Sequence, residues 1–202
     1  MSSLRLITAA TANCVQSTEA LTWVRGSSRL AEFDLIPSMI KTAELYAENH
    51  MKRAIMQQTW RLTLDCIPAD DIIELPRPPL LTPATANVTF TYVDSTGGTQ
   101  TMPSTCYSID AESEPARIYK AYDASWPTDI RNHRDAITIE YNVGATSSTG
   151  VDERIKTWMK FRVGSMYENR ESVMVGTGNF VEELPRSYID GLLDELCIIE
   201  VR

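Results

Sequence analysis

The sequence is poor in the side chains that most often carry acid–base or metal chemistry. Its 202 residues include only two histidines and four cysteines. The cysteines are separated by 52, 40 and 91 residues, form no Cys-x-x-Cys pair and have no histidine cluster beside them. This spacing does not predict a zinc site, and we expect reduced thiols, no metal and no cofactor. The four are Cys14, Cys66, Cys106 and Cys197.

Neither histidine stands in a sequence setting that is typical of catalysis. His50 falls on or beside the apolar stripe of an expected helix, where a hydrogen-bonded core or boundary histidine is the simplest interpretation. His133 lies within the polar and charged run 131–135, which indicates a solvated loop. Acid–base or nucleophilic enzymes need such groups in a recognisable arrangement. We therefore assign no catalytic residue and expect a protein that is not an enzyme.

Long apolar runs and an excess of basic charge are also lacking. No run approaches the ~18–20 apolar residues that a membrane-spanning helix requires. The chain has 19 basic and 27 acidic residues, a net charge of −8. Residues 57–150 hold 6 basic and 12 acidic groups, a net −6. The balance argues against a membrane protein and against one that grips nucleic acid by its phosphates, although DNA can pass a like-charged wall.

Two stretches near the N-terminus show the helical period. A short helix is expected to begin at Ser17 or Thr18 and to end at Gly26. A longer helix is expected over Glu32–Arg53, where apolar residues recur at spacings of three and four. Pro37 falls in its first turn, where a missing N–H costs least.

From Gln57 the hydrophobic period changes to two. Trp60, Leu62 and Leu64 alternate with polar residues, which predicts a half-buried strand. Further strand candidates follow as far as residue 141, and Ser95–Gly98 is typical of a turn. Six or so short strands predict a small sheet or sandwich.

Helical periodicity returns after the Ser/Thr/Gly-rich stretch 144–150. One helix is expected around Ile155–Tyr167, opened by the acidic Asp152 and Glu153. A last helix is expected to begin near Pro185–Ser187.

Neither the two N-terminal helices nor the two C-terminal helices can close a core alone, so we expect the pairs to pack on each other. The expected fold class is α+β, a mainly helical frame of about four helices with an inserted small antiparallel β domain. The expected organisation is N-terminal helices in residues 1–56, the inserted β domain in 57–143, and C-terminal helices in 144–202.

The two expected C-terminal helices differ in charge. The first has four basic residues within nine positions: Arg154, Lys156, Lys160 and Arg162. The last segment is mainly acidic: Glu182, Glu183, Asp190, Asp194, Glu195 and Glu200. The simpler interpretation is solvated faces with local ion pairs. The alternative is that the two faces meet across a subunit boundary, as a ring-closing contact requires.

Short motifs along nearly the whole chain resemble the head-tail connector proteins of tailed phages, the adaptor or head-completion family. The resemblance rests on the order and spacing of these motifs together. They are Leu6–Thr8, the helix around Ala43–Tyr46, Gln58–Leu64, Ile73–Leu80, Tyr92–Asp94, Glu114–Ile118, Ser125–Pro127, Ile139–Tyr141 and Tyr167–Glu171.

The resemblance implies packed helices with a β insertion, and a virion protein located at the head-tail junction after synthesis in the bacterial cytoplasm. It further implies a homo-oligomeric ring, typically twelve-fold, that docks on the portal protein at the capsid vertex. Such a ring extends the DNA channel and offers a surface to the tail or stopper protein. Double-stranded DNA passes through it without sequence-specific binding, and no membrane is involved.

Two sets of residues are candidates for these contacts. We expect the first to contribute to subunit contacts: Arg154, Lys160, Arg162, Glu168 and Arg170. The second would reach toward the portal, as C-terminal segments of similar adaptors do: Cys197, Ile198, Ile199, Glu200, Val201 and Arg202. Alternatives are a tail-completion or terminator ring protein, a free-standing peptide-binding module that uses the proline motif Pro76–Pro79, and a small soluble enzyme. The enzyme would require a pocket that groups His50 or His133 with a cysteine or a carboxylate.

Overall fold

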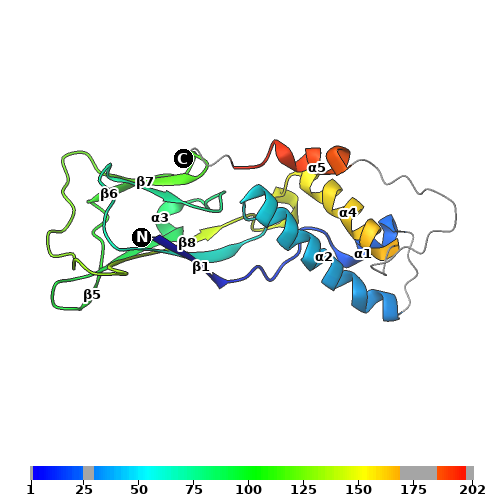
Figure 1. The fold of residues 1–202 in the computed structure, drawn as a ribbon, viewed down its shortest axis with the longest axis horizontal. Helices are drawn as coiled ribbons and strands as arrows, with labels where there is room; N and C mark the ends of the chain where they lie inside the picture. The colour runs from blue at the N-terminus through cyan, green and yellow to red at the C-terminus, as the bar shows by residue number, and fades with distance from the viewer. Residues whose placement is uncertain (1, 25–29, 169–185, 199–202) are drawn as a thin grey trace. The chain divides into compact units, whose positions relative to one another are not determined.

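The computed structural model describes residues 2–24, 30–168 and 186–198 (Figure 1). Within these ranges the chain has five α-helices and eight strands, and the strands pair in two antiparallel sheets. The chain divides into two compact units. The β unit comprises Met1–Thr11 and Met56–Thr146, and the helical unit comprises Ala12–Ile55 and Ser147–Arg202.

The larger sheet of the β unit has the strand order β1-β2-β8-β4-β5. Its strands are β1 (Ser2–Thr8), β2 (Gln58–Leu64), β8 (Ile137–Val143), β4 (Val88–Val93) and β5 (Thr99–Thr101). Successive side chains of a strand point to opposite faces, and the central strand β8 buries every second residue. Ile139 and Tyr141 of β8 are completely buried, so this strand forms the middle of the core.

A smaller sheet of order β3-β7-β6 completes the β unit. Its strands are β3 (Ile72–Leu75), β7 (Ala116–Lys120) and β6 (Tyr107–Asp110), and the short helix α3 (Ala84–Asn87) leads into β4. The Phe90 ring of β4 lies 5.3 Å from the ring of Tyr107 in β6 and 6.1 Å from that of Trp126, measured between centroids. The contact between Phe90 and Tyr107 links the two sheets.

The helical unit contains α1 (Ser17–Trp23), α2 (Leu30–Met51), α4 (Glu153–Glu168), α5 (Arg186–Asp194) and a 3-10 turn at Ser148–Gly150. The core of this unit includes buried residues of α2 that recur every three or four positions, as a single helix face requires. The buried Trp158 of α4 stacks on Tyr46 of α2 at 5.6 Å, and its indole N–H donates to Asp190 of α5 over 3.2 Å. None of the described helices is long and apolar enough to cross a membrane.

The expectation of a mainly helical frame with a small β insertion is wrong. Eight strands in two sheets form a β unit with a core of its own, and helices contribute only part of the described chain. The N-terminus, which was expected to lead only into helices, forms β1 and pairs with β2 from Ser2↔Leu64 onward. All seven side chains of β1 are exposed, so the strand has no buried face that its sequence could reveal. The free edge of β2, more than 50 residues away, decides its structure.

Candidate functional site

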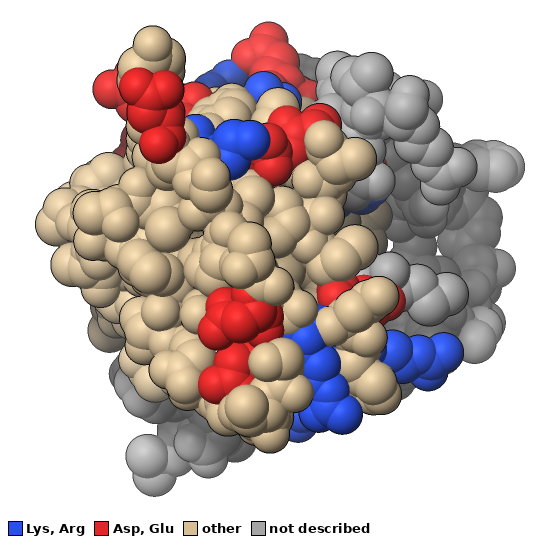
Figure 2. All heavy atoms as spheres, turned by 90° about the vertical axis from the view of Figure 1, so that its left-hand side faces the viewer, with Lys and Arg blue, Asp and Glu red and all other residues tan. Residues whose placement is uncertain are grey.

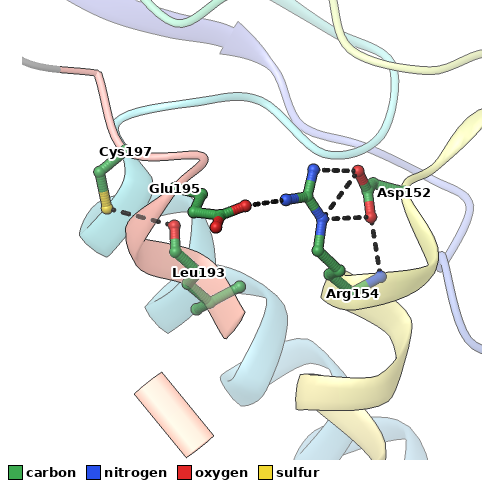
Figure 3. A network of polar contacts seen from close by, with 5 residues as sticks. All are labelled: Asp152, Arg154, Leu193, Glu195 and Cys197. Carbon is green, nitrogen blue, oxygen red and sulfur yellow. Dashed lines mark hydrogen bonds and ion pairs between the residues drawn. The ribbon is translucent and has the colours of Figure 1, made fainter. Parts of the chain in front are cut away.

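The first basic residue of α4, Arg154, is held by partners within the helical unit. Its guanidinium donates to Asp152 Oδ2 over 2.8 Å and to Glu195 Oε2 over 2.6 Å (Figure 3). Asp152 also accepts the backbone N–H of Arg154 over 2.8 Å, as a helix-capping side chain does. Donation by the guanidinium lowers the pKa of Asp152 below its ordinary value. This network ties the start of α4 to Glu195, which directly follows α5.

The next two expected interface residues are also engaged inside the unit. Lys160 Nζ lies 2.5 Å from Glu19 Oε1, which joins α4 to α1. The guanidinium of Arg162 lies over the Tyr46 ring, 5.4 Å from its centroid, which joins α4 to α2. Glu168 is exposed at the last position of α4, and Arg170 lies outside the described residues. The set is therefore not a free basic patch, because three of its members connect α4 to other parts of its own subunit.

The C-terminal candidate segment begins against the end of α2. The Ile198 N–H donates to the Met51 carbonyl over 3.0 Å. The Cys197 thiol lies 3.6 Å from the carbonyl oxygen of His50. It lies 3.5 Å from the carbonyl oxygen of Leu193 (Figure 3). Carbonyl groups at the end of a helix lack intrahelical partners, so they are free to accept these bonds. Residues 199–202 of the segment lie outside the described residues.

The same place brings together three side chains that sequence spacing did not connect. His50 Nε2 lies 3.3 Å from Asp194 Oδ1 across 144 positions of sequence. With the Cys197 sulfur, one ligand atom from each residue lies within 4.8 Å of the other two. Burial, followed by the nearby Asp194 charge, raises the pKa of the Cys197 thiol. An activated cysteine nucleophile has a lowered thiol pKa, whereas the pKa of this thiol is raised.

Another exposed feature is the edge strand β1, which sequence reasoning missed. Its seven side chains are all exposed, and Leu4 and Leu6 are 37% and 38% exposed. One side of β1 pairs with β2, and its other side is an edge of the larger sheet. Unpaired N–H and C=O groups on such an edge are a template for another chain. The alternation of Leu4 and Leu6 with polar residues was the only available signal in the sequence.

The charge of the β unit is not concentrated in one acidic patch on the face that Figure 2 presents. This face lies on the left in Figure 1, nearest β5 and β6. Acidic and basic side chains are scattered on it among a larger area of uncharged residues (Figure 2). The acidic side chains that give residues 57–150 a net charge of −6 therefore do not gather into one cluster on this face.

Chains in solved structures of gene transfer agent (GTA) particles share the fold over nearly the full length. One belongs to the neck of an empty GTA particle computed with C6 symmetry, with a TM-score of 0.77, 20% identity, and coverage of 99% of this chain and 97% of that chain. A second, from the virion of a native GTA particle, has a TM-score of 0.74, 17% identity, and coverage of 98% and 97%. A third, from the neck of a native GTA particle computed with C12 symmetry, has a TM-score of 0.69, 18% identity, and coverage of 99% and 97%.

No protein-family model matches this chain, and no curated protein does so at a significant level. The structural neighbours show a shared fold, and their origin in the necks and virion of GTA particles is consistent with the head-tail connector resemblance of the sequence.

Proposed function

We propose that this chain is a structural neck protein of a tailed-phage or phage-like particle and is not an enzyme. It forms a homo-oligomeric ring at the head-tail junction, docks on the portal, extends the DNA channel and provides the attachment surface for the tail or stopper. The observation that carries this proposal is the fold likeness to a neck chain over 99% of the sequence, at a TM-score of 0.77. Neighbouring necks computed with C6 and C12 symmetry support a ring with rotational symmetry.

A closed ring requires two different, complementary surfaces on each subunit. We assign one of them to the free edge of β1, and its occupant is a second copy of this chain. An extended segment that adds to a sheet edge gains main-chain hydrogen bonds, and exposed apolar side chains such as Leu4 and Leu6 add buried area. The structurally similar neck chains come from necks computed with C6 and C12 symmetry, which favours an adjacent subunit of the same ring as the occupant.

The charged residues of α4 remain a proposed part of the subunit boundary, but they are a poor place to test it. Reversing the charge at Arg154 or Lys160 would break ion pairs with Glu195 or Glu19 inside one subunit. A loss of assembly could then result either from a lost contact between subunits or from a change within the subunit itself. The edge of β1 gives a cleaner test, because its outward side chains are not buried within the subunit.

The C-terminal segment Cys197–Arg202 is the proposed contact with the portal. Its described part is bonded to the end of α2, which fixes the point from which the segment continues. The proposed DNA passage agrees with the net charge of −6 over residues 57–150, because acidic surfaces do not hold phosphates and would let DNA move.

Native mass spectrometry of the purified chain, alone and mixed with portal rings of the same particle, tests the function. We expect bound copies in six-fold or twelve-fold stoichiometry on the portal. A chain that stays free in the presence of portals would refute portal docking. A chain that binds tail tube ends instead would identify a terminator ring.

The double variant Leu4→Lys/Leu6→Lys tests the β1 assignment in the same mixture. We expect it to bind in reduced number and to leave rings open, because charge on the edge opposes strand addition. Tyr122→Lys, at a side chain 95% exposed, is the matched control and should assemble like the wild type. If the β1 variant closes complete rings, the edge assignment is wrong, while the neck function stands.

A further inference from the structure

The ends of α2 and α5 bring three different metal-ligating side chains to one point of the helical unit. His50 lies in the last turn of α2, Asp194 is the last residue of α5, and Cys197 follows three positions later. The imidazole Nε2 and the carboxylate Oδ1 are 3.3 Å apart, and the ligand atoms of all three residues lie within 4.8 Å of one another. We propose that His50, Asp194 and Cys197 form a binding site for Zn²⁺.

The donor set fits zinc better than the hard cations. Nitrogen, sulfur and carboxylate oxygen are the ligands of protein zinc sites, whereas Ca²⁺ and Mg²⁺ prefer oxygen alone. Zinc bond lengths of ~2.0–2.3 Å in a tetrahedron place ligand atoms roughly 3.3–3.6 Å apart. The His50–Asp194 pair already has this spacing. The Cys197 sulfur lies within 4.8 Å of both other ligand atoms, and its approach to zinc bonding distance would complete three corners and leave the fourth to water.

The surroundings allow an ion to enter and hold the imidazole in position. The side chains of His50 and Asp194 are 36% and 66% exposed, so the site is open to solvent. The Tyr46 ring stacks on the His50 ring at 6.2 Å with the planes 9° apart, which restricts its orientation. Pre-oriented ligands lose less conformational freedom when the ion binds.

Metal binding exchanges a proton for the ion at sulfur. A thiol must lose its proton before its sulfur can ligate zinc. When Zn²⁺ binds, the S–H bond breaks, a Zn–S bond forms, and the proton leaves to the buffer; neither sulfur nor zinc changes oxidation state.

The ion would link α2, α5 and the chain that follows α5. Without it, Cys197 and Ile198 are held on α2 by the Ile198–Met51 backbone bond and by long contacts of the thiol. With zinc bound, the ion would connect Cys197, at the start of the C-terminal segment, to the His50 side chain of α2. The site is independent of the proposed neck function, because its test needs only the purified chain.

Co²⁺ is the probe for the test, because a thiolate on tetrahedral Co²⁺ gives a near-ultraviolet charge-transfer band and strong visible bands. The reduced full-length chain should show both bands at one Co²⁺ per chain and lose them when Zn²⁺ is added. Zinc binding in weak buffer should release about one proton per ion at neutral pH. Absence of the charge-transfer band at saturating Co²⁺ would overturn the proposal.

Variants locate the site. Cys197→Ser should abolish the charge-transfer band, and His50→Ala and Asp194→Asn should each weaken zinc binding at least ten-fold. Cys66→Ser, at the exposed cysteine, is the matched control and should behave like the wild type. A band that survives Cys197→Ser, or disappears with Cys66→Ser, would place the ion elsewhere and refute the site. Circular dichroism of each variant checks folding, and a Cys197 variant that fails to fold leaves the decision to His50→Ala and Asp194→Asn.

Discussion

Replacing Gly144 with alanine should strongly destabilise the β unit. Gly144 directly follows β8 and has φ = +88°, a conformation that side chains rarely adopt. A Cβ at this position would lie 2.6 Å from the carbonyl carbon of Met56 and closer still to its oxygen. Beside it, the Gln57 N–H donates to the Ala145 carbonyl over 2.9 Å, so the two backbones are held together and cannot separate freely.

The expected cost follows from three effects. The left-handed backbone costs an alanine about 1–2 kcal/mol, and a collision with backbone atoms adds about 1–3 kcal/mol because no rotamer change relieves it. The lower entropy of alanine in the unfolded chain returns about 0.4–1 kcal/mol. We therefore expect Gly144→Ala to lower the free energy of unfolding by about 1–4.5 kcal/mol.

Urea unfolding followed by circular dichroism measures the change, and hydrogen exchange of peptides from β8 and β2 locates it in the β unit. Gly191→Ala is the matched control, because a Cβ there meets nothing within 4 Å. Gly191 lies inside α5, where alanine is the better helix former by about 0.5–1 kcal/mol. If Gly144→Ala unfolds at the wild-type urea concentration, the close approach of the backbones is not a constraint and the reasoning fails.

Two further predictions concern the core of the helical unit and a turn of the β unit. Trp158→Ala should cost about 3–5 kcal/mol in urea unfolding, because it empties a buried site, whereas Tyr122→Ala should change stability by less than about 0.5 kcal/mol; equal effects would contradict the assignment of the core. Hydrogen bonds from Thr96 and Gln100 hold the pKa of Asp94 well below its ordinary value, so its stabilising effect is present above the unfolded-state pKa of about 3.9 and is lost as the pH falls through the folded-state pKa. Asp94→Asn should therefore lower Tm at pH 7, and its Tm difference from the wild type should narrow below about pH 4; a difference independent of pH would refute this.

Local sequence patterns were sufficient for the longer helices and for strand β2. The period of three to four in α2 and α4, and the alternation in β2, lie where helices and strand are observed. The fold class could not be obtained in this way. Strand β1 has no buried face and exists because it pairs with β2, and the short alternation of Leu4 and Leu6 with polar residues was not enough to predict that pairing.

For the candidate surfaces too, the sequence reveals some features and only the structure reveals others. The basic residues of α4 are visible in the sequence, but their partners are not, since Glu195 is 41 residues from Arg154. The tertiary structure shows that Arg154 and Lys160 also form ion pairs within their own subunit, with Glu195 and Glu19, while a role in subunit contacts stays a proposal. It also places His50 beside Asp194 and Cys197, although the cysteine spacing alone gave no reason to expect a metal site.

The sequence by itself determined the periodicity of the main helices and strands, the acidic balance and the resemblance to neck connectors, because all three are written in local order and composition. Only the tertiary structure decided that two cores form, that an exposed N-terminal strand becomes a sheet edge, and that the ends of α2 and α5 meet. The physical reason is that long-range pairing depends on which distant groups remain unsatisfied, such as the free edge of β2 or the last carbonyls of α2.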